Sequence, residues 1–157
     1  MIRSLLLKYE LIAIDNSKSG EELLIVQFDH GWEGYREYAT HKLELKMFDL
    51  KYSRDLLTMD ICVLPYAEKI SIVDFRSGYE DRGHGSAAMR SLFTIAQRLG
   101  INRISGKISR RDWGHVNKLK YFYEKHGFDV TLNYEKKEGG IEWRRGSRQQ
   151  NNSDFVR

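Results

Sequence analysis

Hydrophobic and polar positions alternate through much of the first half of the chain. Residues 42–47 (KLELKM) repeat with a period of two, which is typical of a strand with one buried face. Turn residues cluster at 15–20 and 65–68, and segment 29–37 is predicted as a glycine-containing loop. Between these breaks, β-rich runs predict further strands over 5–14, 23–28, 56–64 and 69–75. The first half is therefore predicted to be rich in strands.

The second half changes to the spacing of amphipathic helices. Apolar residues recur every three or four positions over 86–99, and Gly100 stands where a helix C-terminal glycine belongs. A second helix is predicted over 115–126, with Gly127 at its end. Strands are predicted over 101–108, 130–134 and 141–144. The last two form a hairpin through Gly139-Gly140. This order predicts an α/β (α+β) fold with helices on the faces of the sheet.

Length and composition fit one domain. The chain has 157 residues, of which 41% are hydrophobic and 31% charged, and no linker or repeat divides it. We predict a single domain over 1–145 and a polar C-terminal tail over 146–157. No apolar run approaches the ~18–20 residues that cross a bilayer, and the apolar start is too short for a signal peptide. We therefore expect a cytoplasmic protein with no membrane partner.

Cysteine and charge content narrow the class of function. Cys62, a single cysteine in an apolar run, is predicted to be a buried structural thiol rather than a nucleophile. The formal net charge of +4 suits a phosphate-bearing ligand. Its cations are spread along the chain and no aromatic residues interleave with a basic strand face, so no nucleic-acid partner is expected. No His or Cys cluster has metal-site spacing, so no metal is expected.

The loop between strand 69–75 and helix 86–99 is the main candidate for chemistry. It ends in Arg82-Gly83-His84-Gly85-Ser86. Glycines without Cβ atoms let a bulky anion approach the backbone, and the first-turn amides of a helix have no helical partners. With the helix dipole and donors from Arg82 and Ser86, the segment predicts either a pyrophosphate site or simply a tight strand-to-helix turn. P-loop and GxGxxG spacings are both absent.

Two motifs together resemble the GNAT superfamily of N-acetyltransferases. Gly83-His84-Gly85-Ser86 resembles its acetyl-CoA loop, Gln/Arg-x-x-Gly-x-Gly/Ala, and 122–128 (FYEKHGF) resembles its second signature, (F/L)YxxxGF. The motifs follow in family order, and the similarity covers about 69–143, roughly half of the chain. The resemblance implies a GNAT-like, mostly antiparallel sheet flanked by helices, acetyl-CoA as co-substrate and an amine as acceptor. A homodimer is left open.

The resemblance also implies roles for particular residues. The strand end whose backbone would pair with the pantetheine arm is Val73, Asp74 and Phe75. The residues that would hold the pyrophosphate are Asp81, Arg82, Gly83, His84, Gly85 and Ser86. A backbone N–H near Phe75 would bind the oxyanion. Tyr123 matches the tyrosine that stands near the CoA sulfur in many members and would protonate the leaving thiolate; its alternative role is a core aromatic.

Two positions depart from the family pattern. Glu80 stands where the family usually has Gln or Arg. Val116 stands where the family often has Asn, and Asn117 follows one residue later. Asn117 either contacts CoA or caps the second helix. The backbone amides of the loop are expected to do most of the phosphate binding.

The general base and the acceptor pocket are less well defined. A lysine-like amine, with a pKa near 10.4, must lose a proton before it attacks. We assign this role to Glu68, with Asp74 or a water chain to His84 or His115 as alternatives. Family members usually carry one or two helices after the first strand, whereas this chain shows only a short helical segment near 34–40. The sequence therefore does not specify the acceptor.

Two functions are compatible with these patterns. The first is an N-acetyltransferase in which the amine attacks acetyl-CoA directly. The second is a catalytically inactive GNAT-like module that binds acyl-CoA or a protein partner. The basic segment 110–113 (RRDW) either contacts the 3′-phosphate of CoA or is solvated, and the basic residues of 144–148 belong to the soluble tail.

Overall fold

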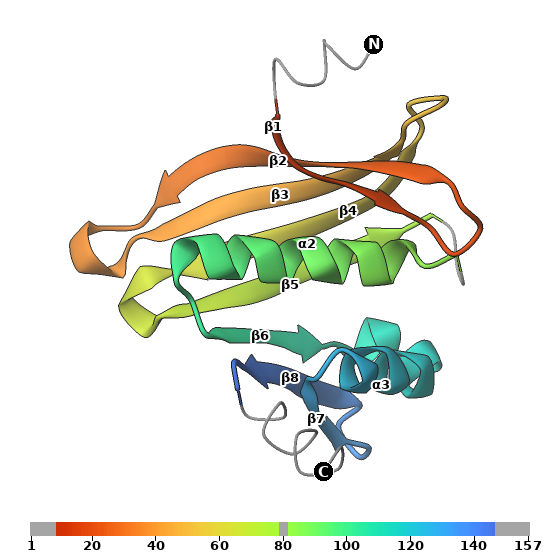
Figure 1. The fold of residues 1–157 in the computed structure, drawn as a ribbon. Helices are drawn as coiled ribbons and strands as arrows, with labels where there is room; N and C mark the ends of the chain where they lie inside the picture. The colour runs from red at the N-terminus through yellow and green to blue at the C-terminus, as the bar shows by residue number, and fades with distance from the viewer. Residues whose placement is uncertain (1–8, 79–81, 147–157) are drawn as a thin grey trace, which may run out of the picture.

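The computed structural model describes residues 9–78 and 82–146 (Figure 1). In this part of the chain one eight-stranded sheet forms, in the order β1-β2-β3-β4-β5-β6-β8-β7. The strands are β1 (Glu10–Asn16), β2 (Glu22–Glu33), β3 (Thr40–Asp49), β4 (Asp55–Leu64), β5 (Lys69–Ser77), β6 (Arg103–Ile108), β7 (Asp129–Asn133) and β8 (Glu138–Arg144). All neighbouring pairs are antiparallel except β5 and β6, which are parallel.

Helices connect the strands of the second half. The described helices are α2 (His84–Leu99), α3 (Val116–Lys125) and the 3-10 helices η1 (Arg36–Tyr38), η2 (Pro65–Ala67) and η3 (Arg110–His115). α2 crosses from β5 to β6, as a parallel pair requires. Gly100 and Gly127 follow the two α-helices with φ of +67° and +89°, as their sequence positions predicted. The predicted fold class, a mixed and mostly antiparallel sheet flanked by helices, is confirmed.

One face of the sheet carries the main core and is covered by α2 (Figure 1). Alternate residues of the central strands point to this face and are buried: Leu43, Leu45, Met47, Met59, Ile61 and Val63. The apolar stripe of α2 belongs to the same core through Ala88, Met89, Leu92, Ile95 and Ala96. Each large side chain removed from water in this way contributes about 1.5–3 kcal/mol. The period-two and helical patterns of the sequence therefore meet at one interface.

The opposite face of the central strands is polar and half-exposed. Its side chains on β3 and β4 are Lys42, Glu44, Lys46, Thr58, Asp60 and Cys62. Neither α-helix of the described part packs there, because both bury their apolar stripes on the core side. The segment between β2 and β3 is short and holds only η1, so the short helix predicted near 34–40 is confirmed.

Strand β2 is longer than predicted. It continues to Glu33 through part of the segment predicted as a loop. The register shifts at a bulge between Asp29 and Gly31, which leaves His30 without a partner in β3. Gly31 has a φ of +83°, and Asp29 Oδ1 accepts a hydrogen bond from Gly31 N at 2.7 Å. The glycine therefore bends the strand without ending it.

The β7–β8 hairpin turns before its two glycines. The turn occupies 134–137, and Gly139 and Gly140 lie within β8. A Cβ on Gly139 would lie 2.6 Å from the carbonyl oxygen of Thr131. The glycine is therefore required by the close approach of β7, and its predicted place in the turn is wrong.

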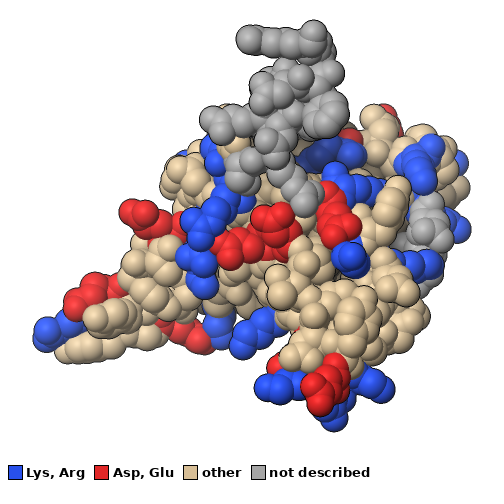
Figure 2. Space-filling model, turned by 90° about the horizontal axis from the view of Figure 1, so that it is seen from below, with Lys and Arg blue, Asp and Glu red and all other residues tan. Residues whose placement is uncertain are grey.

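Cys62 is not a buried core thiol. It is half-exposed on the polar face, because alternate residues of β4 point to opposite sides of the sheet. In the described residues, no helix is long and apolar enough to span a membrane. Nor do those residues bring three His, Cys, Asp or Glu side chains together as a metal site. Figure 2 shows acidic and basic side chains interspersed on the face seen from below.

Candidate functional site

Strands β5 and β6 separate at one end of the sheet. Their pairing is limited to Ile70↔Ile104, Ser71↔Ser105 and Ile72↔Gly106, although β5 continues to Ser77. The register between β4 and β5 also shifts here, so that Val73 forms a bulge. Figure 1 shows the two strands separating toward the end where α2 begins. The backbone of 73–75 therefore borders a gap between parallel strands, where an extended ligand can add to the edge.

The side chains of 73–75 have different surroundings. Val73 is exposed, whereas Phe75 packs at the margin of the core with its ring centroid 6.0 Å from that of Phe122. Asp74 lies on the polar face, directly opposite Asp60 of β4. Its carboxylate accepts a hydrogen bond from Phe75 N at 3.0 Å and forms an ion pair with Arg76 Nε at 3.1 Å. The amide of Phe75, the predicted oxyanion donor, is therefore engaged with its neighbour.

The first turn of α2 faces the same end of the sheet. Its first helical hydrogen bond runs from Ala87 N to Gly83 O, so the amides of Gly85 and Ser86 lack helical acceptors. A Cβ on Gly85 would lie 3.0 Å from the ring of Phe122. Close packing against α3 therefore also requires a glycine at this position, in addition to any requirement for an anion to approach the backbone. Of the predicted phosphate-binding residues, Asp81 lies outside the described residues, as does Glu80.

The side chain of His84 points into the protein. It is 1% exposed, and its Nε2 lies 3.2 Å from Oε2 of Glu21, in the turn between β1 and β2. This hydrogen bond holds the pKa of Glu21 below its ordinary value. Only the backbone of His84 is therefore placed for an anion, and the water chain from its imidazole to an amine finds no support.

Ser86 is joined to a residue that the sequence did not single out. Its Oγ lies 3.1 Å from Nε2 of His126, which follows α3. Burial, reinforced by the charges of Lys125 and Arg90, lowers the pKa of His126 to about 4. His126 is therefore neutral at pH 7, and its Nε2 can donate to or accept from the serine. Its position inside the FYEKHGF motif was the feature of the sequence that could have identified it as a site residue.

Tyr123 is buried among the aromatic residues of its own motif. It is 6% exposed, with its ring 5.3 Å from Phe122 and 5.4 Å from Phe128. Burial raises its pKa to about 12, with a smaller contribution from Asp112. The hydroxyl has no hydrogen-bond partner among the described residues. Tyr123 is thus a protonated phenol in an apolar setting.

Other predicted residues lie apart from this group. Glu68 occupies a left-handed turn before β5 and stands five positions before the bulge at Val73, a separation of about 16 Å along an extended strand. Asn117 is exposed on α3, and the N-cap position is His115, without a side-chain cap. The structure therefore does not bring Glu68 to the gap, and Asn117 does not cap the helix.

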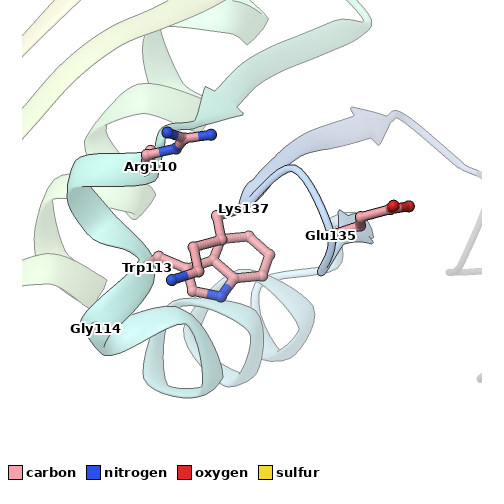
Figure 3. A pocket seen from close by; sticks show the side chains of 5 residues that line it. All are labelled: Arg110, Trp113, Gly114, Glu135 and Lys137. Carbon is pink, nitrogen blue, oxygen red and sulfur yellow. The ribbon is translucent and has the colours of Figure 1, made fainter.

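A surface pocket of about 480 Å³ lies beside η3 (Figure 3). Its lining residues are Arg110, Trp113, Gly114, Glu135 and Lys137. Arg110 donates to the carbonyl oxygen of Lys136 at 3.4 Å, which ties η3 to the β7–β8 turn. The basic segment 110–113 therefore forms one side of this pocket and is held in place by the β7–β8 turn. The neighbouring Arg111 approaches Asp74 to 3.8 Å across the gap between β5 and β6.

Comparison with solved structures identifies the fold. The GNAT domain of S. lividans PAT matches 84% of this chain and 96% of its own, with a TM-score of 0.61 and 11% identity. PaiA N-acetyltransferase from Thermoplasma acidophilum, in complex with coenzyme A, matches 66% of this chain and 60% of its own, with a TM-score of 0.53 and 19% identity. A spermidine N-acetyltransferase chimera from Vibrio cholerae SpeG and hSSAT matches 69% of each chain, with a TM-score of 0.54 and 9% identity.

The chain therefore has the fold of the GNAT superfamily of N-acetyltransferases. No family model matches it. Among curated proteins, it is 31% identical over 134 residues to the uncharacterized protein YocC of Bacillus subtilis (strain 168), covering 85% of this chain and 76% of that protein. The chain belongs to the same family as YocC.

Proposed function

We propose that this protein is an N-acetyltransferase that transfers the acetyl group of acetyl-CoA to an amine by direct attack. The observation that carries the proposal is the gap between β5 and β6, bordered by the bulge at Val73 and open toward the first turn of α2. A GNAT-fold protein of similar architecture was solved with coenzyme A. The pantetheine arm would follow the free edge of 73–75, and the pyrophosphate would bind at the amides of Gly85 and Ser86.

Three groups of this chain would assist the transfer. Backbone N–H groups of the bulged segment would stabilise the oxyanion of the tetrahedral intermediate. The buried phenol of Tyr123 would give its proton to the sulfur that leaves, since its pKa of about 12 keeps it protonated. Asp74, in place of Glu68, would accept the proton of the incoming amine, because it lies beside the bulge on the polar face.

The alternative, a catalytically inactive GNAT-like module, is favoured by the ion pairing of Asp74. Arg76 Nε and Arg111 Nη2 lie 3.1 Å and 3.8 Å from this carboxylate, in the space that an incoming amine would need. An active enzyme therefore needs the acceptor to displace these arginines. The two functions differ in turnover rather than in binding.

Two measurements test the proposal in sequence. Isothermal titration with acetyl-CoA comes first, and release of CoA over a panel of small amines and peptides follows. We expect binding, and turnover that Asp74→Asn lowers by about 10²-fold. Absence of acetyl-CoA binding would overturn the cofactor assignment. Binding without turnover on any amine would favour the inactive module.

A further inference from the structure

The turn between β1 and β2 packs directly against the segment that leads into α2. Lys18 N donates a hydrogen bond to the carbonyl oxygen of Arg82 at 3.0 Å. A Cβ on Gly83 would lie 3.1 Å from Lys18 N and 3.4 Å from Lys18 Cβ. Gly83, with a φ of +80°, therefore makes room for the turn as well as beginning the helix.

Buried and half-buried side chains fix this contact. Glu21 Oε2 lies 3.2 Å from the fully buried His84, the first residue of α2. Ser17 Oγ accepts a hydrogen bond from Glu21 N at 3.0 Å, and Ser17 is itself buried. The position of Lys18 between Ser17 and Glu21 is thus set from both sides.

Lys18 differs from Arg90, a basic residue of the adjoining helix. Arg90 of α2 is paired with Asp15 at 2.9 Å, whereas Lys18 is exposed and forms no ion pair within the described residues. A lysine ammonium reaches about 5 Å from its Cβ on a flexible stem. The backbone of Lys18 lies against Arg82 and Gly83. The free amides of the first turn of α2, those of Gly85 and Ser86, follow Gly83 by two and three residues. The ammonium can therefore reach an anion bound at these amides.

We propose that Lys18 is a phosphate-binding residue of the cofactor site, and that the Glu21–His84 pair positions it there. The inference rests on the proposed function, because the phosphate in question is the pyrophosphate of CoA. Strand β1 and its turn then form one wall of the site, which the two sequence motifs do not include. An ammonium on a phosphate forms a charge-assisted contact that adds to the backbone amides.

The test is a set of titrations with acetyl-CoA, dephospho-acetyl-CoA and acetyl-pantetheine. Lys18→Ala is expected to raise the Kd of the first two ligands equally, by about five- to tenfold, and to leave that of acetyl-pantetheine unchanged. Lys18→Arg should retain wild-type affinity. Arg98→Ala is the matched control, since it removes one charge from the far end of α2, about 21 Å away, and should change no Kd.

A double-mutant cycle tests the positioning role. In a Glu21→Gln background, Lys18→Ala is expected to change the Kd less than twofold, because the turn is no longer held against His84. Thermal melts confirm that each variant folds. If Glu21→Gln does not fold, the comparison of Lys18→Ala with Lys18→Arg tests the inference in its place. An unchanged Kd in Lys18→Ala overturns the inference, as does a loss seen with acetyl-CoA alone. Failure of the wild type to bind acetyl-CoA is a separate outcome that overturns the proposed function.

Discussion

Ser86 and His126 form a hydrogen bond between the beginning of α2 and the end of α3, with 3.1 Å between Oγ and Nε2. The two residues are 40 positions apart, one in each GNAT-like motif. The contact joins the first turn of α2, where we propose that phosphate binds, to the helix that carries Tyr123. Substitutions at this junction are therefore expected to affect both stability and cofactor binding.

His126 makes stability depend on pH in a defined window. Its pKa is about 4 in the folded chain, below the ordinary 6.5, so the unfolded chain binds the proton more readily between these values. The stability contributed by neutral His126 is complete above pH 6.5 and is lost as the pH falls toward 4. Urea unfolding at several pH values should show a steeper loss for the wild type than for His126→Gln between pH 6.5 and 5. Equal slopes in the two proteins would contradict this.

Tyr123 provides a test of the chemistry that separates turnover from binding. Tyr123→Phe removes only the hydroxyl from a buried ring, so we expect kcat to fall by about 10²-fold while the Kd of acetyl-CoA stays the same. Tyr121→Phe, on the exposed face of the same helix, is the matched control and should retain full activity. Steady-state kinetics and titration calorimetry measure the two quantities. Wild-type kcat in Tyr123→Phe would assign the tyrosine to the core alone.

A side chain at Gly85 is predicted to destabilise the protein while Phe122 is present. A Cβ would lie 3.0 Å from Cε2 and 3.2 Å from Cζ of that ring, so Gly85→Ala should lower the free energy of unfolding by about 1–3 kcal/mol. Shortening the ring in Gly85→Ala/Phe122→Leu should recover part of this loss. Gly114→Ala, with no atom within 4 Å of the new Cβ, is the control. Denaturant unfolding decides, and equal stability of the two single variants would refute the packing argument.

Gly139 and Gly140 offer a sharper comparison within one strand. A Cβ on Gly139 would lie 2.6 Å from the backbone oxygen of Thr131, which cannot rotate away. A Cβ on Gly140 meets its nearest atom, the oxygen of Gly106, at an ordinary 3.9 Å. Gly139→Ala should therefore cost about 2 kcal/mol or more and weaken the β7–β8 pairing, whereas Gly140→Ala should be nearly neutral. Thermal unfolding of both variants is the measurement, and similar melting temperatures would count against this reading.

The sequence predicted the local structure around the candidate site well. The glycine loop begins α2, the FYEKHGF segment ends α3, and both glycine caps fall where the pattern placed them. These features depend on helical periodicity and on backbone conformations that few residues adopt. Such constraints act over a few residues and are therefore visible in the chain itself.

The misplaced predictions depend on contacts between distant residues. Nothing local shows that a bulge precedes Gly31, or that Gly139 lies close to the carbonyl oxygen of Thr131 on the neighbouring strand. The same holds for the side chain of His84, which turns toward Glu21 in a turn 63 residues earlier. In each case the partner is a residue brought close by the packing of the strands and helices rather than by the neighbouring sequence.

The sequence by itself determined the order of strands and helices, the two helix ends and the motifs that resemble a CoA-binding family. Only the tertiary structure decided that β5 and β6 separate at Val73, that Ser86 meets His126 and that the β1–β2 turn lies against the beginning of α2. The physical reason is the separation along the chain over which each kind of interaction acts. Propensity and periodicity are properties of short segments, whereas a binding site is formed where packing brings remote segments into contact.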